Sequence, residues 1–317
     1  MAQGNSAHAR KISDFSDLRE KTRYQAGGVE ISVARHSGYC WGVQRAYDVT
    51  LAEAKRAKET GESIVTFGPL IHNPQTIDEL KHKHGVDYVE STDEVTDGKV
   101  IVRTHGIPLN SYEEFKKKGI NVIDATCPYV KVTQNYAALL HKQKYHVVIV
   151  GDYKHPEVIS ILSFARGEGT VVKTVADVDK IPKHLMRLGV VVQSTMILEH
   201  VNHVIAALLA RAQEVRVFNT ICYVTSERQG DAEEIASKND VVVVIGGKAS
   251  SNTKKLAVVA ESFGARTQLI EGPEELDLNA LGDAKRIGVL AGASTPNWLI
   301  DQVVGLIEKH CNAAGVA

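Results

Sequence analysis

The sequence predicts an α/β protein with largely parallel sheets, folded as three similar lobes. From Ile31 onward, short β-branched runs alternate with longer segments that have helical spacing. Most of the short runs are continuously apolar, as expected for strands that are covered on both faces. Three cysteines, Cys40, Cys127 and Cys222, each follow a strand-like run and precede a helix-like segment. A repeated strand–cysteine–helix unit is therefore the simplest description of the chain.

The predicted elements alternate along the 317 residues, a length that corresponds to roughly two or three domains of about 100 to 150 residues. The clearest strands are expected at 31–34, 99–103, 146–150, 190–193, 240–245 and 286–290. The clearest helices are expected at 41–58, 128–142, 197–212, 223–238, 251–263 and 296–310. We expect an N-terminal extension over 1–29, either an added helix or a loose tail, and lobes over 30–126, 127–221 and 222–317.

Polar strand-end loops recur at similar intervals after each cysteine. The loops carry His72 and His105 after Cys40, His155 and Thr195 after Cys127, and Ser250 and Ser294 after Cys222. In open parallel sheets, the carboxyl ends of the strands and the following helix N-termini form the ligand crevice. Nine such ends would face one centre if the lobes form a pseudo-threefold trefoil. A single polar loop is ordinary at such a turn, but a cysteine at the same place three times is not.

Composition limits the function classes. The formal net charge is −1, so there is no electrostatic case for binding nucleic acid. No run approaches the roughly 18 apolar residues that span a membrane, and the N-terminus lacks the apolar core of a secretory signal, so we expect a cytoplasmic protein. In a reducing compartment its four cysteines would be thiols, metal ligands or nucleophiles rather than disulfides.

The three repeated cysteines suit a metal cluster. At a helix N-terminus, exposed amides and the helix dipole favour the thiolate, which is the form that binds metal. Full cysteine ligation of a [4Fe–4S] cluster needs four thiolates, so three would leave one iron open for a substrate. Cys311 lies outside the repeat and is interpreted as incidental. Zinc bound by three cysteines and one histidine is the alternative, although a closed structural zinc site needs no surrounding polar groups.

The polar loops predict a site for a small diphosphate. Hydrogen-bond donors and helix N-termini suit such an anion. The expected donors are His72, His105, His155, Ser250, Ser251, Asn252 and Ser294. Glu157, at the head of a predicted helix, would face the cluster and the anion, which should raise its pKa and make it a proton donor. Thr195 could relay that proton or hold a substrate hydroxyl. The chemistry expected is reductive removal of a hydroxyl group from a small diphosphate.

Nine motifs in order carry a family resemblance. They are Gly38-Tyr39-Cys40-Trp41-Gly42-Val43, Gly68-Pro69-Leu70-Ile71-His72-Asn73, Thr104-His105-Gly106, Asp124-Ala125-Thr126-Cys127-Pro128, His155-Pro156-Glu157-Val158, Gln193-Ser194-Thr195, Ile221-Cys222-Tyr223-Val224-Thr225, Ser250-Ser251-Asn252 and Ala291-Gly292-Ala293-Ser294-Thr295-Pro296. From about Val33 to Cys311 the chain resembles the 4-hydroxy-3-methylbut-2-enyl diphosphate reductase family. Trp41 departs from the pattern, because many members have a small residue there, and this puts the breadth of substrates in question.

The resemblance implies a trefoil around a [4Fe–4S] cluster held by Cys40, Cys127 and Cys222. It also implies a proton source at Glu157 and a threonine near the substrate hydroxyl at Thr195. The implied diphosphate ligands are His72, His105, His155, Ser250, Asn252 and Ser294, with Ser251 in the same loop. The implied reaction is the last step of the non-mevalonate isoprenoid pathway, which yields isopentenyl and dimethylallyl diphosphates with two electrons from ferredoxin or flavodoxin. Two alternatives stay open: an iron–sulfur dehydratase without redox turnover, and a metal-stabilised module that binds phosphorylated ligands.

Overall fold

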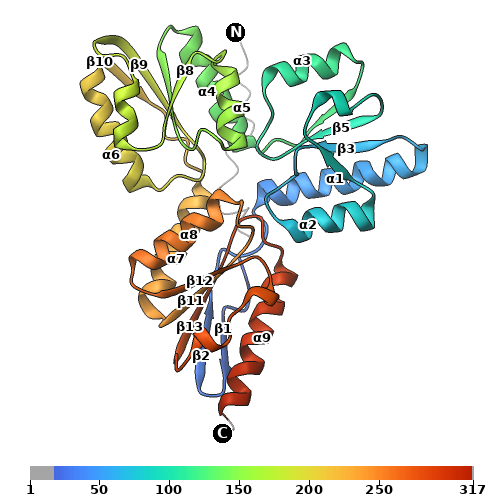
Figure 1. Cartoon of the computed structure of the whole chain (residues 1–317), viewed down its shortest axis with the longest axis vertical. Helices are drawn as coiled ribbons and strands as arrows, with labels where there is room; N and C mark the ends of the chain where they lie inside the picture. Colours follow the sequence, from blue (N-terminus) through green and yellow to red (C-terminus); the bar gives the residue numbers. More distant parts are fainter. Residues whose placement is uncertain (1–17, 316–317) are drawn as a thin grey trace, which may run out of the picture.

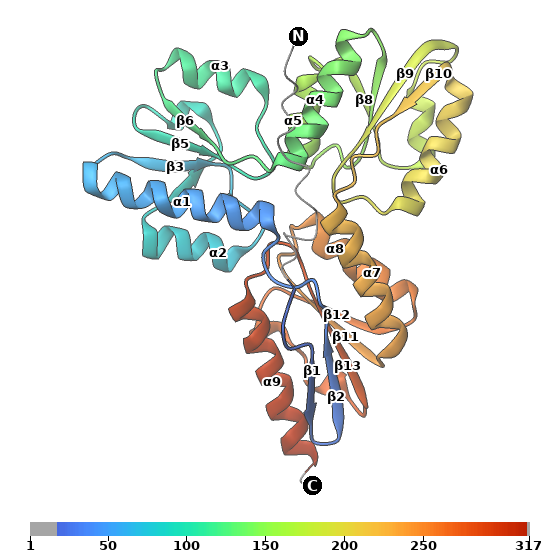
Figure 2. The same cartoon turned by 180° about the vertical axis from the view of Figure 1, so that it is seen from behind.

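The computed structural model describes residues 18–315, which form three α/β lobes arranged around a common centre (Figure 1, and from behind in Figure 2). Each lobe has a sheet of parallel strands, and only the pairing of β1 with β2 in the third sheet is antiparallel among the described strand pairs. The predicted α/β trefoil with mostly parallel sheets is confirmed.

The first lobe has the strand order β4-β3-β5-β6. Its strands are β3 (Ile64–Phe67), β4 (Asp87–Val89), β5 (Lys99–Val102) and β6 (Asn121–Asp124), and its helices are α1 (Trp41–Thr60), α2 (Pro74–Glu79) and α3 (Leu109–Lys117). Helices α1 and α2 cover one face of the sheet and α3 the other (Figure 1).

The second lobe repeats this arrangement with the strand order β8-β7-β9-β10. Its strands are β7 (His146–Val150), β8 (Gly169–Val172), β9 (Leu185–Val192) and β10 (Ala212–Val217), and its helices are α4 (Pro128–Lys142), α5 (Pro156–Phe164) and α6 (Leu198–Leu208). The helix predicted over 197–212 is shorter than expected, because a 3₁₀ turn over Leu209–Arg211 ends it and Ala212 already begins β10.

The third lobe has the order β1-β2-β13-β11-β12. Its strands are β1 (Arg23–Ala26), β2 (Val29–Val33), β11 (Val241–Ile245), β12 (Arg266–Ile270) and β13 (Arg286–Ala291), and its helices are α7 (Tyr223–Lys238), α8 (Ser251–Ser262) and α9 (Asn297–Gly315). In each lobe the strand that leads into the next cysteine lies beside the strand of the second polar loop. β6 and β10 occupy this place in the first two sheets, and β2 occupies it in the third.

The lobe boundary predicted at residue 30 is therefore wrong. β2 pairs in parallel with β13, with Ile31 opposite Ile287, so this strand belongs to the third sheet and not to the first. β2 therefore takes, in the third sheet, the position beside the strand of the second polar loop that β6 and β10 take in the first two. The expected helix or loose tail is also wrong over β1, which pairs antiparallel with β2. Residues 1–17 of the predicted extension lie outside the described residues.

Every sheet has an apolar core on both faces, as the continuous apolar runs predicted. β11 reads Val-Val-Val-Val-Ile and is buried along its whole length. Alternate residues of β11 pack on opposite faces, Val243 with α9 residues such as Ile300 and Val244 with α8 residues such as Leu256. Such β-branched side chains favour the extended backbone. The sheets thus hold their strand ends rigidly at the centre.

Proline fixes the start of three helices at this centre. Pro74, Pro128 and Pro156 stand in the first turns of α2, α4 and α5. The fixed φ of proline suits a first helical turn, where its missing N–H would have no partner. Among the described residues, no helix is both long and apolar enough to span a membrane.

Candidate active site

All twelve residues predicted to form the site line one pocket at the meeting point of the three lobes. The pocket has a volume of about 110 Å³. Its lining includes Cys40, Cys127, Cys222, Glu157, Thr195, His72, His105, His155, Ser250, Ser251, Asn252 and Ser294. Residues separated by more than 200 positions in the chain therefore share one cavity, because the strand ends of all three lobes converge there.

The three cysteines occupy equivalent places in the backbone. Cys40, Cys127 and Cys222 are the N-caps of α1, α4 and α7. Each cysteine N–H donates to a carbonyl in the neighbouring strand-end loop: Cys40 to Ala293 at 3.0 Å, Cys127 to Thr104 at 2.9 Å and Cys222 to Ser194 at 2.9 Å. The same bond in each lobe directs the three thiols toward one region. Cys311 instead packs in the core of the third lobe, outside the pocket.

The helix of the first lobe approaches the cysteine of the second lobe very closely. A Cβ atom built on Gly42 would lie 2.7 Å from the Cys127 sulfur and 4.0 Å from the Cys40 sulfur. Only glycine leaves room here, so both sulfurs lie beside the first turn of α1. The buried Arg228 of α7 donates to the carbonyl oxygens of His36, Gly38 and Ala291. This side chain ties the loop that carries Cys40 to the third lobe.

The thiols differ from the expectation in their protonation. Burial raises the pKa of both Cys127 and Cys222 to about 12, although backbone N–H groups at the helix N-termini act in the opposite direction. The free-energy cost of removing a thiolate from water is larger than the stabilisation by the N–H groups of the helix terminus. The protein without metal therefore holds these two groups as thiols. Metal binding must displace their protons, as it does at other cysteine sites.

Three histidines form a tight cluster on one side of the pocket. The ring centroids of His72 and His105 are 4.5 Å apart, those of His105 and His155 5.2 Å, and those of His72 and His155 5.6 Å. One ring nitrogen from each lies within 4.8 Å of the others. Burial lowers the pKa of His72 to about 4 and that of His155 to about 3, and it places the pKa of His105 well below its ordinary value. All three imidazoles are neutral at pH 7.

Several buried polar atoms of the histidine cluster and of the neighbouring Asn252 have no hydrogen-bond partner within residues 18–315. They are His72 Nε2, His105 Nδ1, and both Nδ2 and Oδ1 of Asn252. Buried polar groups are normally hydrogen-bonded, so these atoms are available to bind a ligand in the pocket. His155 Nδ1 accepts from the Glu157 N–H at 3.2 Å, which leaves the proton of the neutral ring on Nε2. The cluster could hold a metal ion or donate to an anion, and the neighbouring hydroxyl and amide groups favour the anion.

Glu157 is the buried carboxyl group of the site. It has an exposed fraction of 1%, and it accepts from the Ser194 backbone N–H and from the Ser194 hydroxyl, both at 2.7 Å. Burial raises its pKa, against the effect of both bonds from Ser194. The predicted rise is confirmed, but desolvation is sufficient to cause it. The raised pKa favours the acid form of a group beside the pocket, as a proton donor requires.

The remaining hydroxyl groups come from the second and third lobes. Thr195 Oγ1 and Ser251 Oγ are 2.9 Å apart. Ser250 caps α8 by accepting from the Thr253 N–H at 3.3 Å, and Ser294 Oγ donates to the His72 carbonyl at 3.3 Å. Ser250 keeps its own proton for a ligand, whereas Ser294 would donate to a ligand by turning its proton away from the His72 carbonyl, because a hydroxyl group has one donor position.

Three important residues were not predicted as site residues. Ser194 holds Glu157, Gln193 donates to Thr195 and Ser251, and Lys255 contacts Thr195. Gln193 and Ser194 stand beside Thr195 in the sequence, so the motif was visible, but their partners were not. Lys255 has no distinguishing signal in the sequence.

The chain is similar to known proteins of one family. A family described as LytB protein matches residues 31–308. The proteins named 4-hydroxy-3-methylbut-2-enyl diphosphate reductase from Geobacter sp. (strain M21) and Aquifex aeolicus (strain VF5) are 41% and 42% identical, over 88% and 89% of this chain and 97% of each relative.

Two solved structures are also similar. The structure of the E-1-hydroxy-2-methyl-but-2-enyl-4-diphosphate reductase from Plasmodium falciparum matches with a TM-score of 0.82, 30% identity and 87% of each chain covered. A structure of (E)-4-hydroxy-3-methyl-but-2-enyl diphosphate reductase, described as the terminal enzyme of the non-mevalonate pathway, matches with a TM-score of 0.63, 39% identity, and 88% of this chain and 99% of that chain covered. The chain belongs to the LytB family of 4-hydroxy-3-methylbut-2-enyl diphosphate reductases.

Proposed function

We propose that this protein reduces (E)-4-hydroxy-3-methylbut-2-enyl diphosphate to isopentenyl and dimethylallyl diphosphates, the last step of the non-mevalonate pathway. The observation that carries the proposal is the single pocket in which three thiols, a ring of uncharged donors and one buried carboxyl group with a raised pKa meet. The overall reaction replaces a C–O bond by a C–H bond, consumes two electrons and two protons, and releases water. Each part of the pocket matches one of these requirements.

Membership of this family implies a metal cofactor. We infer a [4Fe–4S] cluster held by Cys40, Cys127 and Cys222, because these are the half-buried thiols that converge on the pocket from three helix N-termini. When bound, such a cluster would supply electrons and, with three protein ligands for four irons, one Lewis-acidic open iron. The proposed electron donor is a ferredoxin or a flavodoxin.

The uncharged donors would bind the diphosphate group. Neutral imidazoles can each donate one N–H, and the amide of Asn252 is buried without a partner within residues 18–315. Ser250, Ser251 and Ser294 add hydroxyl groups, and α5 and α8 direct their N-termini toward the same region. An anion in this cluster would also raise the pKa of the histidines, so binding would be coupled to proton uptake at lower pH.

Glu157 would supply a proton at its carboxyl oxygen. Its burial raises its pKa and so favours the acid form, and Ser194 holds both carboxyl oxygens in place. Proton donation by a positioned group of matched pKa typically contributes about 10²- to 10⁴-fold to the rate. Thr195 would lie next to the substrate hydroxyl and fix its orientation.

The test is iron and sulfide analysis of anaerobically purified protein, combined with an assay of the hydroxylated diphosphate and a low-potential reductant. We expect brown protein with about four irons per chain and turnover that requires the reductant. Colourless protein with stoichiometric zinc would contradict the cluster. Turnover without a reductant would indicate a dehydratase, and ligand binding that survives serine at all three cysteines would indicate a binding module.

A further inference from the structure

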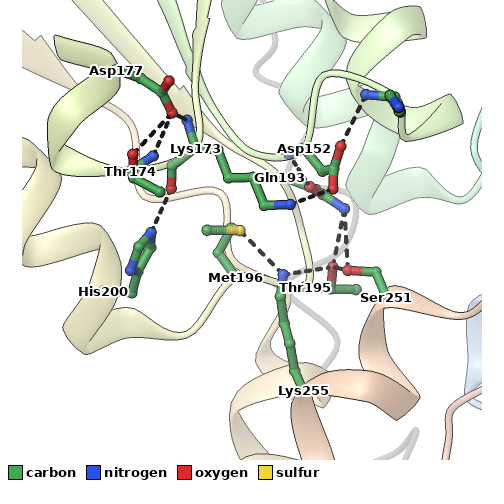
Figure 3. Close-up of polar contacts among 11 residues, drawn as sticks. Asp152, Lys173, Thr174, Asp177, Gln193, Thr195, Met196, His200, Ser251 and Lys255 are labelled. Carbon is green, nitrogen blue, oxygen red and sulfur yellow. Dashed lines mark hydrogen bonds and ion pairs between the residues drawn. The ribbon is translucent and has the colours of Figure 1, made fainter. Parts of the chain in front are cut away.

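A second cavity adjoins the active-site pocket across a thin wall. It has a volume of about 590 Å³ and shares His72, His155 and Ser251 with the pocket. The side chain of Lys255, on α8, lines this outer cavity but not the pocket. Figure 3 shows its ammonium group next to the Met196 sulfur and the Thr195 hydroxyl, at 3.1 Å and 3.5 Å. Lys255 therefore lies directly behind the wall of the active site.

Gln193 reaches the same hydroxyl group from the other side. Its Oε1 accepts from the Asp152 N–H at 3.0 Å, so its amide nitrogen must face Thr195 and Ser251. That nitrogen lies 3.2 Å from Thr195 Oγ1 and 3.4 Å from Ser251 Oγ (Figure 3). The fully buried Gln193 is thus fixed as a donor.

The hydrogen bonds can be assigned a direction. A hydroxyl oxygen accepts two bonds and donates one. Gln193 and Lys255 together fill the acceptor positions of Thr195, since an ammonium group can only donate. The Thr195 proton is then left for Ser251, 2.9 Å away. Ser251 accepts from Thr195 and Gln193, so its own proton is left for a ligand in the pocket.

We infer that Lys255 is a positioning residue which, together with Gln193, makes Thr195 a donor to Ser251 and Ser251 a donor to the bound diphosphate substrate. The inference rests on the proposed function. Lys255 does not touch the substrate in this scheme. Because its ammonium group only donates, Thr195 cannot direct its own proton toward Lys255 and directs it toward Ser251 instead.

The charge of Lys255 gives this role a pH dependence. Burial lowers the pKa of Lys255 to about 8, although Glu157 from α5, in its ionised form, and Asp152 from the loop after β7 raise it. Lys173, after β8, also lowers it, while itself pairing with Asp152 at 2.8 Å. Above that pKa the neutral amine gains an acceptor position. Thr195 can then donate to Lys255 instead of to Ser251. The fixed order of donation, from Thr195 to Ser251 and from Ser251 to the ligand, is therefore lost as the pH rises through about 8.

The test is the pH profile of kcat/KM for the cluster-loaded enzyme and its Lys255→Met and Lys255→Arg variants. Methionine keeps most of the length of the side chain but donates no hydrogen bond, so we expect about a tenfold loss at pH 7 and no fall near pH 8 beyond the alkaline limit that Glu157 sets in every variant. Arginine donates and stays charged throughout the pH range of the assay, so we expect activity within about threefold of wild type and no fall near pH 8 beyond the alkaline limit that Glu157 sets. The matched control is Lys154→Met, which removes a lysine from the same cavity at an exposed position without a contact to Thr195.

Iron content and thermal melting would be measured for every variant. If Lys255→Met does not fold, the pH profile of Lys255→Arg tests the inference alone: its kcat/KM should not decrease near pH 8 as that of the wild type does. Wild-type activity in Lys255→Met would overturn the inference. So would Lys255→Arg that is as impaired as Lys255→Met, or that keeps the fall near pH 8. Lack of turnover by the wild-type enzyme would instead refute the proposed function, so the two failures are distinguishable.

Discussion

The second and third lobes place different groups at the same position of the same structural unit. Glu157 lies two residues after His155, the N-cap of α5, and Asn252 lies two residues after Ser250, the N-cap of α8. Both side chains are buried, with exposed fractions of 1% and 5%. Ser194 donates twice to the carboxyl group of Glu157, whereas the amide of Asn252 has no partner within residues 18–315.

This difference shows how one repeated unit can carry two functions. The second lobe satisfies its buried group internally, which holds a proton donor in a fixed orientation. The third lobe leaves its buried group unsatisfied, which keeps hydrogen-bonding capacity for a ligand. The backbone is the same in both cases, so the division of roles depends on the side chain and on its neighbour across the sheet.

The largest expected effect comes from removing the acidic proton of Glu157 in the second lobe. Glu157→Gln keeps the shape and can still accept from Ser194, but it has no acidic proton. We expect kcat to fall about 10²- to 10⁴-fold while iron content and KM change little. Steady-state kinetics and iron analysis measure this. A variant with near wild-type kcat would show that the carboxyl group is not the proton source.

Removing the unsatisfied group of the third lobe should act on binding. For Asn252→Ala we expect KM to rise about ten- to a hundredfold, because a hydrogen bond to a charged group contributes about 1.5 to 3 kcal/mol. The unfolding free energy without ligand should stay the same or increase, since no internal bond is lost. Calorimetric titration with substrate and thermal melting check the two parts. Clear destabilisation of the ligand-free variant would contradict the comparison.

The histidine cluster predicts a loss of stability in acid. The folded protein holds His72, His105 and His155 with lowered pKa, so only the unfolded chain takes up their protons below about pH 6.5. Stability is therefore fully present above that value and falls toward pH 4, by up to about 1.4 kcal/mol per pH unit for each histidine. Denaturant unfolding of the protein without an iron–sulfur cluster, at a series of pH values, measures this loss of stability.

The matched control for this prediction is His105→Asn, whose stability should fall less steeply with acid. Glu157 opposes the histidines, because its raised pKa makes the folded state bind its proton more tightly. The acid dependence of stability with and without His105 is therefore best compared in the Glu157→Gln background, where the opposing contribution of Glu157 is absent. An equal slope with and without His105 would show that its pKa is not depressed.

The smallest expected effect comes from Ser194→Ala, which removes one of the two bonds that hold Glu157. The backbone N–H of residue 194 remains, so we expect kcat to fall only about three- to tenfold. The lost bond stabilised the carboxylate, so the pKa of Glu157 should rise further. The decrease of kcat that follows from deprotonation of Glu157 should then occur at higher pH. The pH dependence of kcat measures the shift, and an unchanged profile would exclude this role for Ser194.

The sequence by itself determined the fold class, the repeat and the set of residues that meet. These features depend on local patterns: β-branched runs such as Val241–Ile245 form buried strands, and cysteines that end such runs become helix N-caps. The twelve predicted residues could be named because parallel strands bring all their carboxyl ends to one edge of each sheet.

Only the tertiary structure decided which sheet each edge strand joins and what each buried group contacts. β2 has the pattern of a strand but no local signal for pairing with β13, more than 250 residues away. The bonds from Ser194 to Glu157 and from Lys255 to Thr195 likewise join separate elements. The thiols of Cys127 and Cys222 were expected to ionise at helix N-termini, but burial reverses this. Desolvation depends on everything that surrounds a group in space, and the residues next to it in the chain do not specify that environment.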